Sequence, residues 1–108
     1  MSEAESEWLP QPDVEDIELV KVLQALGDPV RLSLLKLYST GKRFSCAPDA
    51  LGVAHLHKST VSHHLKIMRE AGLTSTRAAG RNRYVQLRRD DLDARFPGLL
   101  DSLIKSTP

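Results

Sequence analysis

The clearest pattern of hydrophobic and polar positions lies in residues 58–72, KSTVSHHLKIMREAG. At 100° per residue, Val61, Leu65 and Met68 fall within one narrow arc, the spacing of an amphipathic helix with one buried face. Gly72 can supply the left-handed residue that commonly follows a helix C-terminus. The pattern therefore predicts a helix that begins near residue 58 and ends just before Gly72.

The opposite side of this predicted helix is polar and basic. Ser59 or Thr60 can cap its N-terminus. The outward positions hold hydroxyls, an imidazole and cations: Ser59, Ser62, His63, Lys66 and Arg69. Such groups reach phosphates and base edges in a major groove, although an ordinary surface helix has the same pattern. The neighbouring segments decide between these two interpretations.

Two apolar segments precede it. Residues 13–26 predict a first helix with Asp13 as a candidate cap, and residues 28–41 predict a second helix. In the second, Asp28 can cap and Pro29 occupies the first helical position, where a missing N–H costs nothing. The first has a wide apolar stripe: Ile17, Leu19, Val20, Val22, Leu23 and Leu26. Extra apolar surface on a terminal helix favours a dimer contact.

The remaining segments complete the order of elements. Residues 48–52 permit a short helix, followed by a turn or linker at 53–57. Residues 73–79 and 83–88 have the composition of two strands joined by Gly80-Arg81-Asn82, which predicts a hairpin. One helical turn is expected within 89–96. A last helix is predicted over 98–105, with Leu99, Leu100, Leu103 and Ile104 as its apolar positions.

Composition and charge narrow the function classes. The 108 residues fit one domain, and the lone cysteine excludes a disulfide framework. We expect a cytoplasmic protein, because no apolar run approaches the ~20 residues of a membrane span and the acidic start is atypical of a signal peptide. Residues 1–20 hold seven acids and no Lys or Arg, whereas residues 58–89 hold eight bases and one acid. Such separation indicates a surface for a polyanion.

The order of elements is that of a helix-turn-helix followed by a basic wing. Three stretches, LGDPVRLSLLKLYSTG (26–41), STVSHHLKIMREAGL (59–73) and GRNRYVQL (80–87), resemble the ArsR/SmtB family of bacterial winged-helix regulators. The fold class expected is mainly α with a small β-hairpin. The resemblance implies a homodimeric repressor that binds a palindromic operator and responds to a small signal. It also implies a dimer interface formed by the first and last helices.

These inferences assign roles to individual residues. Residues 1–12 are expected to be a flexible acidic tail, and residues 13–108 a winged helix-turn-helix domain for DNA binding and dimerisation. The residues expected to contact DNA are Lys58, Ser59, Thr60, Ser62, His63, Lys66, Arg69, Arg77, Arg81, Asn82 and Arg83. His64, nearer the apolar side, is expected to be partly buried and hydrogen-bonded. The residues expected at the dimer interface are Leu19, Leu23, Leu99, Leu100 and Leu103.

This chain lacks the residues that bind metal in the best-known members of the family. Where those sensors carry a cysteine pair, this chain has FSCAPDALGV with Cys46 alone, and residues 97–108 contain no histidine. No thiolate site and no site on the terminal helix is therefore expected, and no cofactor is required. If a divalent metal such as nickel or zinc regulates the protein, the pattern favours His55 or His57 with carboxylates. Cys46 has no resolving partner nearby in sequence, which disfavours a redox switch.

Two other classes of function remain for comparison. The sequence contains no Gly-rich phosphate loop and no nucleophile motif, so an enzyme is not expected. A winged helix that docks on another regulator without touching DNA is the alternative. An interaction surface usually has an apolar centre. The hydroxyls and cations of residues 58–89 favour DNA instead.

Overall fold

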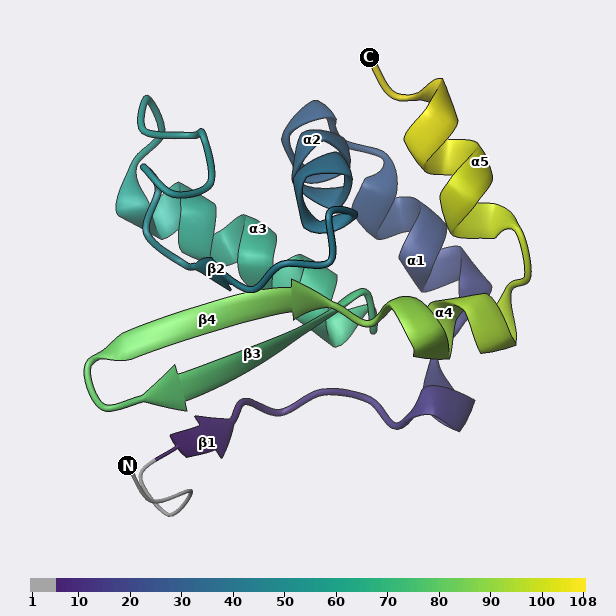
Figure 1. Ribbon diagram of the computed structural model, residues 1–108, viewed down its shortest axis with the longest axis horizontal. Coiled ribbons are helices and arrows are strands. Elements are labelled where there is room, and N and C mark those ends of the chain that lie inside the picture. The colour runs from purple at the N-terminus through teal and green to yellow at the C-terminus, as the bar shows by residue number, and fades with distance from the viewer. Residues whose placement is uncertain (1–5) are drawn as a thin grey trace.

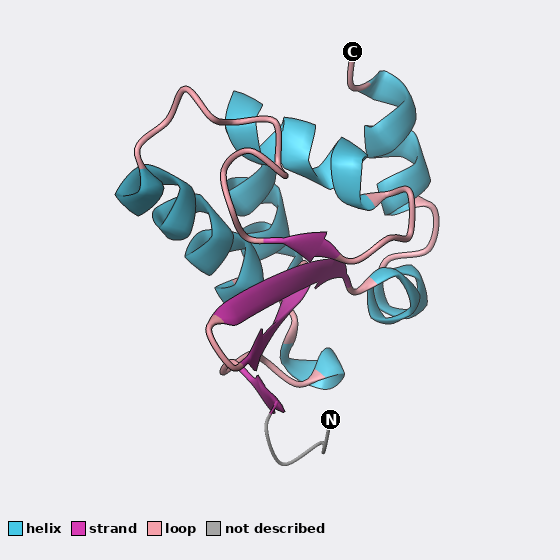
Figure 2. Ribbon diagram, turned by 60° about the vertical axis from the view of Figure 1, so that its left-hand side comes forward, coloured by secondary structure: helices cyan, strands magenta, loops and turns pink. Residues whose placement is uncertain are grey.

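The computed structural model describes residues 6–108 and comprises helices packed on a small antiparallel sheet (Figure 1). The elements are β1 (Ser6–Trp8), the 3-10 helix η2 (Val14–Asp16), α1 (Leu19–Leu26), α2 (Pro29–Tyr38), β2 (Phe44–Ser45), α3 (Lys58–Glu70), β3 (Thr74–Ala79), β4 (Asn82–Leu87), α4 (Arg89–Arg95) and α5 (Leu99–Ser106). The strand order is β1-β3-β4-β2. Figure 2 shows α3 along one side of this sheet. Within residues 6–108, no helix is long and apolar enough to cross a membrane.

Helix α2 begins as its sequence predicts. Asp28 Oδ2 accepts hydrogen bonds from the backbone N–H groups of Val30, at 2.9 Å, and Arg31, at 3.1 Å. Pro29 is the first helical residue. Two of the N–H groups that a helix start leaves without a helical partner are therefore satisfied. Leu35 and Tyr38 of this helix are completely buried.

Helix α3 ends at a left-handed glycine, as predicted. Gly72 has a φ of +89°. The Leu73 N–H donates to the Met68 carbonyl oxygen at 3.0 Å, and the Gly72 N–H donates to that of Arg69 at 3.0 Å. These two bonds form a Schellman motif, and the Leu73 and Met68 side chains are both fully buried beside it. The motif fixes where the chain leaves the helix for strand β3.

The predicted cap at the other end of α3 is wrong. His57 occupies the N-cap position and makes no capping hydrogen bond through its side chain. Ser59 and Thr60 instead lie within the first turn, where both are exposed. The helix therefore begins two residues earlier than a Ser59 cap would require, and both hydroxyls stay on the surface.

The first predicted helix, 13–26, is divided in two. Residues 14–16 form η2, Ile17 is extended (φ −72°, ψ 122°), and α1 begins only at Leu19. Asp13 makes no capping hydrogen bond through its side chain. The extended backbone directs Ile17 into the core, where it is 1% exposed. Burial of this side chain thus outweighs the helical periodicity of the segment.

The short helix predicted at 48–52 is replaced by consecutive turns. The Leu51 N–H donates to the Pro48 carbonyl oxygen at 3.2 Å, and the Gly52 N–H to that of Asp49 at 3.3 Å. Gly52 has a φ of +71°, which ends the helical path after one turn. Leu51 and Val53 are nevertheless buried, so the segment packs as the first half of a helix-turn-helix would.

The hairpin of β3 and β4 agrees with the predicted strands to within one residue at each end. Two further strands extend it. Phe44 of β2 lies opposite Val85 of β4, and residues 6–8 form β1 along the outer edge of β3. The structure thus differs from the expected flexible tail over residues 6–8, because the free edge of β3 accepts another strand. Residues 1–5 lie outside the described part of the chain.

Three arginines hold the segment between β1 and α1 against the body of the protein. Arg69 Nε donates to the Pro10 carbonyl oxygen at 3.1 Å, and Arg88 Nη1 donates to that of Pro12 at 2.7 Å. Arg95 Nη2 donates to the Ile17 carbonyl oxygen at 2.6 Å. The segment lacks regular secondary structure over most of its length, so these bonds satisfy carbonyl groups that no helix or strand engages.

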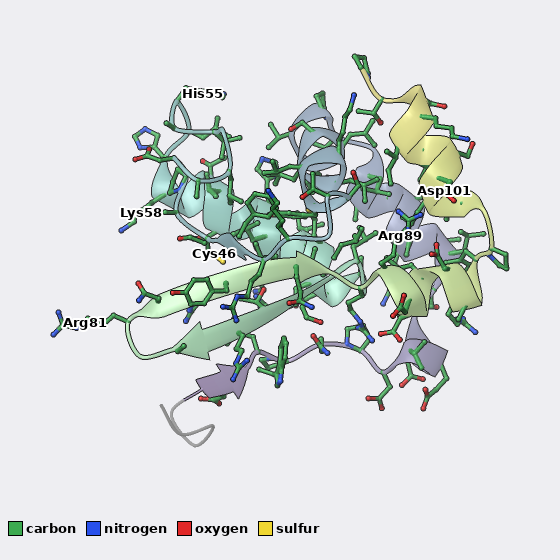
Figure 3. The ribbon with its side chains drawn as sticks, viewed as in Figure 1. Cys46, His55, Lys58, Arg81, Arg89 and Asp101 are labelled. Atoms are coloured by element: carbon green, nitrogen blue, oxygen red, sulfur yellow. The ribbon has the colours of Figure 1, made fainter. Side chains whose placement is uncertain are left out.

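The C-terminal helices are close to their predicted positions. Helix α4 occupies seven residues where one turn was expected. Helix α5 covers 99–106, one residue later than predicted. Arg89 of α4 pairs with Asp93 at 3.0 Å and also with Asp101 of α5 (labelled in Figure 3). The first pair lies within α4, and the second links α4 to α5.

Candidate nucleic-acid interface

Helix α3 has the two faces that its sequence predicts. Val61, Leu65 and Met68 are buried in the core. Six of the residues expected to contact DNA are exposed on this helix: Lys58, Ser59, Thr60, Ser62, His63 and Lys66. In Figure 3, Lys58 points away from the body of the protein at the N-terminal end of α3. The polar face is therefore free to enter a groove over residues 58–66.

The turn between β3 and β4 forms a projecting basic tip. Gly80 has a φ of +62°, which the tight turn requires. Arg81, Asn82 and Arg83 are all exposed. Figure 3 shows Arg81 at the far end of the hairpin, on the same side of the molecule as Lys58. Helix α3 and the hairpin tip thus present cations toward one common side.

Two of the eleven residues expected at DNA are partly buried and already engaged. Arg69 donates to the Pro10 carbonyl oxygen. The Arg77 guanidinium carbon lies 5.8 Å from the centre of the Trp8 ring, within the range of a cation–π contact. Both side chains therefore help to hold the N-terminal segment. These contacts could not be predicted, because β1 has only three residues and no recognisable pattern of its own.

His64 connects three helices. It is partly buried, and its Nδ1 lies 3.0 Å from Arg31 Nη1 and 3.9 Å from Asp28 Oδ2. Arg31 Nε also donates to the Ala25 carbonyl oxygen in α1. The prediction of a partly buried, hydrogen-bonded His64 is confirmed. Arg31 was not predicted as the partner of His64. Arg31 lies three residues after the cap Asp28, and this spacing places Arg31 and Asp28 on the same turn of α2, the one that faces α3.

The same contacts perturb the Asp28 carboxyl group. Partial burial works to raise its pKa. The backbone N–H groups of Arg31 and Val30 and the charges of Arg31 and His64 act in the opposite direction and are stronger. The pKa of Asp28 is therefore lower than usual, and the carboxylate is the stable form where α2 meets α3.

The residues expected at a dimer interface fall into two groups. Leu19 is 43% exposed and Leu23 46%, with Val20 exposed beside them on α1. Leu99 and Leu103 on α5 are partly exposed. Leu100, by contrast, is only 1% exposed and belongs to the core of the chain itself. A stripe of apolar side chains thus remains uncovered on the two terminal helices, without Leu100.

A metal site is not found among the side chains of residues 6–108. In the described part of the chain, no three His, Cys, Asp or Glu side chains come together in a group able to hold an ion. His55 and His57 are exposed in the loop before α3, where Figure 3 shows His55 at the edge of the molecule. Burial raises the pKa of the Cys46 thiol, and the charges of Arg83 and Arg69 offset this only in part.

Comparisons with known proteins agree with this geometry. Residues 28–76 match the family model described as "Bacterial regulatory protein, arsR family". The chain is 40% identical to the uncharacterized HTH-type transcriptional regulator YceK of Bacillus subtilis (strain 168), over 77% of this chain and 83% of that protein. It is 38% identical to an arsenical resistance operon repressor of Staphylococcus xylosus, over 70% of this chain and 71% of that protein.

A solved structure gives the same result for the fold. The crystal structure of a possible transcriptional regulator for arsenical resistance superposes with a TM-score of 0.56 at 28% identity, covering 84% of this chain and 99% of that one. Helix α3 and the basic hairpin are thus the recognition helix and the wing of a winged helix-turn-helix. The chain belongs to the ArsR family of DNA-binding transcriptional regulators and is not an enzyme.

Proposed function

We propose that this protein is a homodimeric transcriptional repressor that binds a palindromic operator. In each subunit α3 lies in the major groove, with Ser62, His63 and Lys66 at the base edges. The tip residues Arg81 and Arg83 hold phosphate. The observation that carries the proposal is the exposed polar and basic face of α3 beside an exposed basic hairpin tip. Both project to one side of the molecule (Figure 3).

The uncovered apolar stripe supports the homodimer. Leu19, Val20 and Leu23 of α1 are each more than two-fifths exposed. Exposed apolar patches of this kind mark interaction sites in soluble proteins. A two-fold axis through this stripe would present two recognition helices, and a two-fold symmetric protein reads a palindromic site. Repression is proposed because the similar proteins of known role are named as repressors.

Selection from a random duplex pool tests the proposal. The full chain is used to enrich duplexes through several rounds, and the affinity of the enriched duplex is then compared with that of the starting pool by fluorescence anisotropy. We expect enriched sequences with two inverted half-sites and two subunits bound per duplex. Specific binding about 10³-fold tighter than binding to the pool is expected. A dimer that enriches no sequence would favour the alternative of a protein-interaction module.

A further inference from the structure

The face of the sheet that points away from α3 carries an alternating row of aromatic rings and guanidinium groups. Trp8 of β1 lies opposite Arg77 of β3, and Arg77 lies opposite Tyr84 of β4. Arg43, directly before β2, places its guanidinium carbon 4.8 Å from the centre of the Tyr84 ring. With the Arg77–Trp8 contact at 5.8 Å, these four residues form a continuous row across the sheet, named here the outer row.

The pleat of the sheet establishes which face this is. Val85 and Thr76, opposite each other in the register, are buried on the side of α3. Successive strand residues point to opposite faces, so Tyr84 and Arg77 point outward. The polar and small residues that share the outward positions of β3, β4 and β2 are Ser45, Ser75, Ala79, Asn82 and Gln86. Among the described residues at these positions there is no acid.

The outer row borders a shallow hollow next to the hairpin tip. Its volume is about 310 Å³, and Arg43, Arg77, Ala79, Asn82 and Tyr84 line it. Asn82 belongs both to this lining and to the tip proposed to contact DNA. The outer face is therefore continuous with the proposed DNA interface. A duplex bound at the tip would extend past this face.

We propose that the outer row binds the phosphate backbone of duplex DNA just outside the half-site contacted by α3. This inference rests on the proposed function and extends it to flanking DNA. The aromatic rings hold the planar guanidinium groups in place, which lowers the entropy lost when each one binds a phosphate. Arg43 and Arg77 place two positive charges in the outer row, and charge of this sign suits a polyanion. The face thus fits DNA by charge and by position.

Trp8 provides a direct measurement, because it is the only tryptophan in the chain and is 53% exposed. Two duplexes are compared, both carrying the enriched operator. The short one ends at the outer edge of each half-site, and the long one continues for about one helical turn, or 10 base pairs, on each side. We expect the long duplex to change the Trp8 emission spectrum and the short one to leave it unchanged.

Salt dependence with matched variants completes the test. For the long duplex, Arg43→Ala should reduce the slope of log K against log salt by about 0.9 per subunit, since one phosphate contact is lost. For the short duplex the slope should stay the same. Arg43→Lys keeps the charge and should retain most of the slope. Lys21→Ala removes an exposed cation on α1 and should leave the salt slope unchanged for both duplexes.

The outcomes separate this inference from the proposed function. One outcome is that the short duplex binds specifically while the long duplex leaves Trp8 emission unchanged and Arg43→Ala leaves its salt slope unchanged. In that case the outer row does not contact DNA, and the proposed function stands. If neither duplex binds, both proposals fail. If the Trp8 emission spectrum changes with protein concentration in the absence of DNA, the outer row contacts a second copy of the chain. That result would also overturn the inference.

Discussion

Ile17 packs directly over Gly72, and the space between them admits no further atom. A Cβ added at Gly72 would lie 2.6 Å from Ile17 Cγ1 and 2.9 Å from its Cδ1. The glycine also has a φ of +89°, which side-chain-bearing residues rarely adopt. One close contact thus joins the segment before α1 to the end of the recognition helix.

Replacing Gly72 by Ala should therefore destabilise the fold through both effects. The left-handed backbone costs roughly 1–2 kcal/mol, and overpacking against Ile17 costs about 1–3 kcal/mol more. Urea unfolding followed by circular dichroism measures the sum. Gly80→Ala is the matched control: its φ is +62° but nothing lies within 4 Å of its added Cβ. Equal losses of stability for the two variants would show that the Ile17 contact is unimportant.

Asp28 should make stability depend on pH at the acid end. Its folded-state pKa is lower than usual, so its contribution is complete above the unfolded value of about 3.9 and is lost as pH falls through the folded value. At neutral pH, Asp28→Ala should lower the free energy of unfolding by about 1 kcal/mol, because the variant lacks the side chain that caps α2. The difference from wild type should shrink as pH falls below the unfolded value. Chemical denaturation at a series of pH values checks this, and a constant difference down to pH 2 would contradict it.

The Cys46 thiol should react slowly in the folded protein. Its raised pKa leaves less of the nucleophilic thiolate at neutral pH than a free cysteine has. Alkylation by iodoacetamide at pH 7.5, followed by mass spectrometry, should be several-fold slower than for the same chain in denaturing urea. Raising the pH should bring the folded rate closer to the unfolded one. An equal rate for both states at pH 7.5 would contradict the raised pKa of the folded thiol.

Leu103→Asp should weaken the proposed dimer and, with it, DNA affinity. The Leu103 side chain is partly exposed on α5 as a member of the uncovered stripe, and a buried carboxylate without a partner is strongly unfavourable. Light scattering at micromolar concentration should report a monomer for this variant and a dimer for wild type. Lys105→Asp places the same charge on the far side of α5 and should leave the dimer intact. A wild-type monomer at this concentration would refute the homodimer.

The sequence predicted the elements whose signals are local. The buried face at Val61, Leu65 and Met68 and the glycine ending at 72 depend on residues within one helix, and both are correct. The helix predicted over 13–26 forms over 19–26 but is interrupted at Ile17, which is drawn into a contact with Gly72, distant in sequence. Strand β1 was missed for the same reason, since three residues acquire a strand conformation only from pairing with β3.

In the candidate site, too, features with a local sequence signal were predicted and features that depend on distant contacts were not. The exposure of Ser62, His63 and Lys66 follows from helical periodicity alone and was predicted. The engagement of Arg69 by Pro10 and of Arg77 by Trp8 depends on where the N-terminal segment lies. No sequence period encodes that placement. An arginine can contact another part of the fold, a ligand or both, and its partners within the fold are known only from the three-dimensional arrangement.

The role of α3 in reading DNA is tested most directly by comparing two classes of variant on operator and random duplexes across a range of salt concentration. His63→Ala or Ser62→Ala should reduce the preference for operator by about 1–3 kcal/mol per lost base contact, with little change in salt dependence. Arg81→Ala should weaken binding to both duplexes equally and reduce the log–log salt slope by about one. If both classes reduce affinity for the two duplexes in the same proportion, α3 does not read bases and the account is wrong.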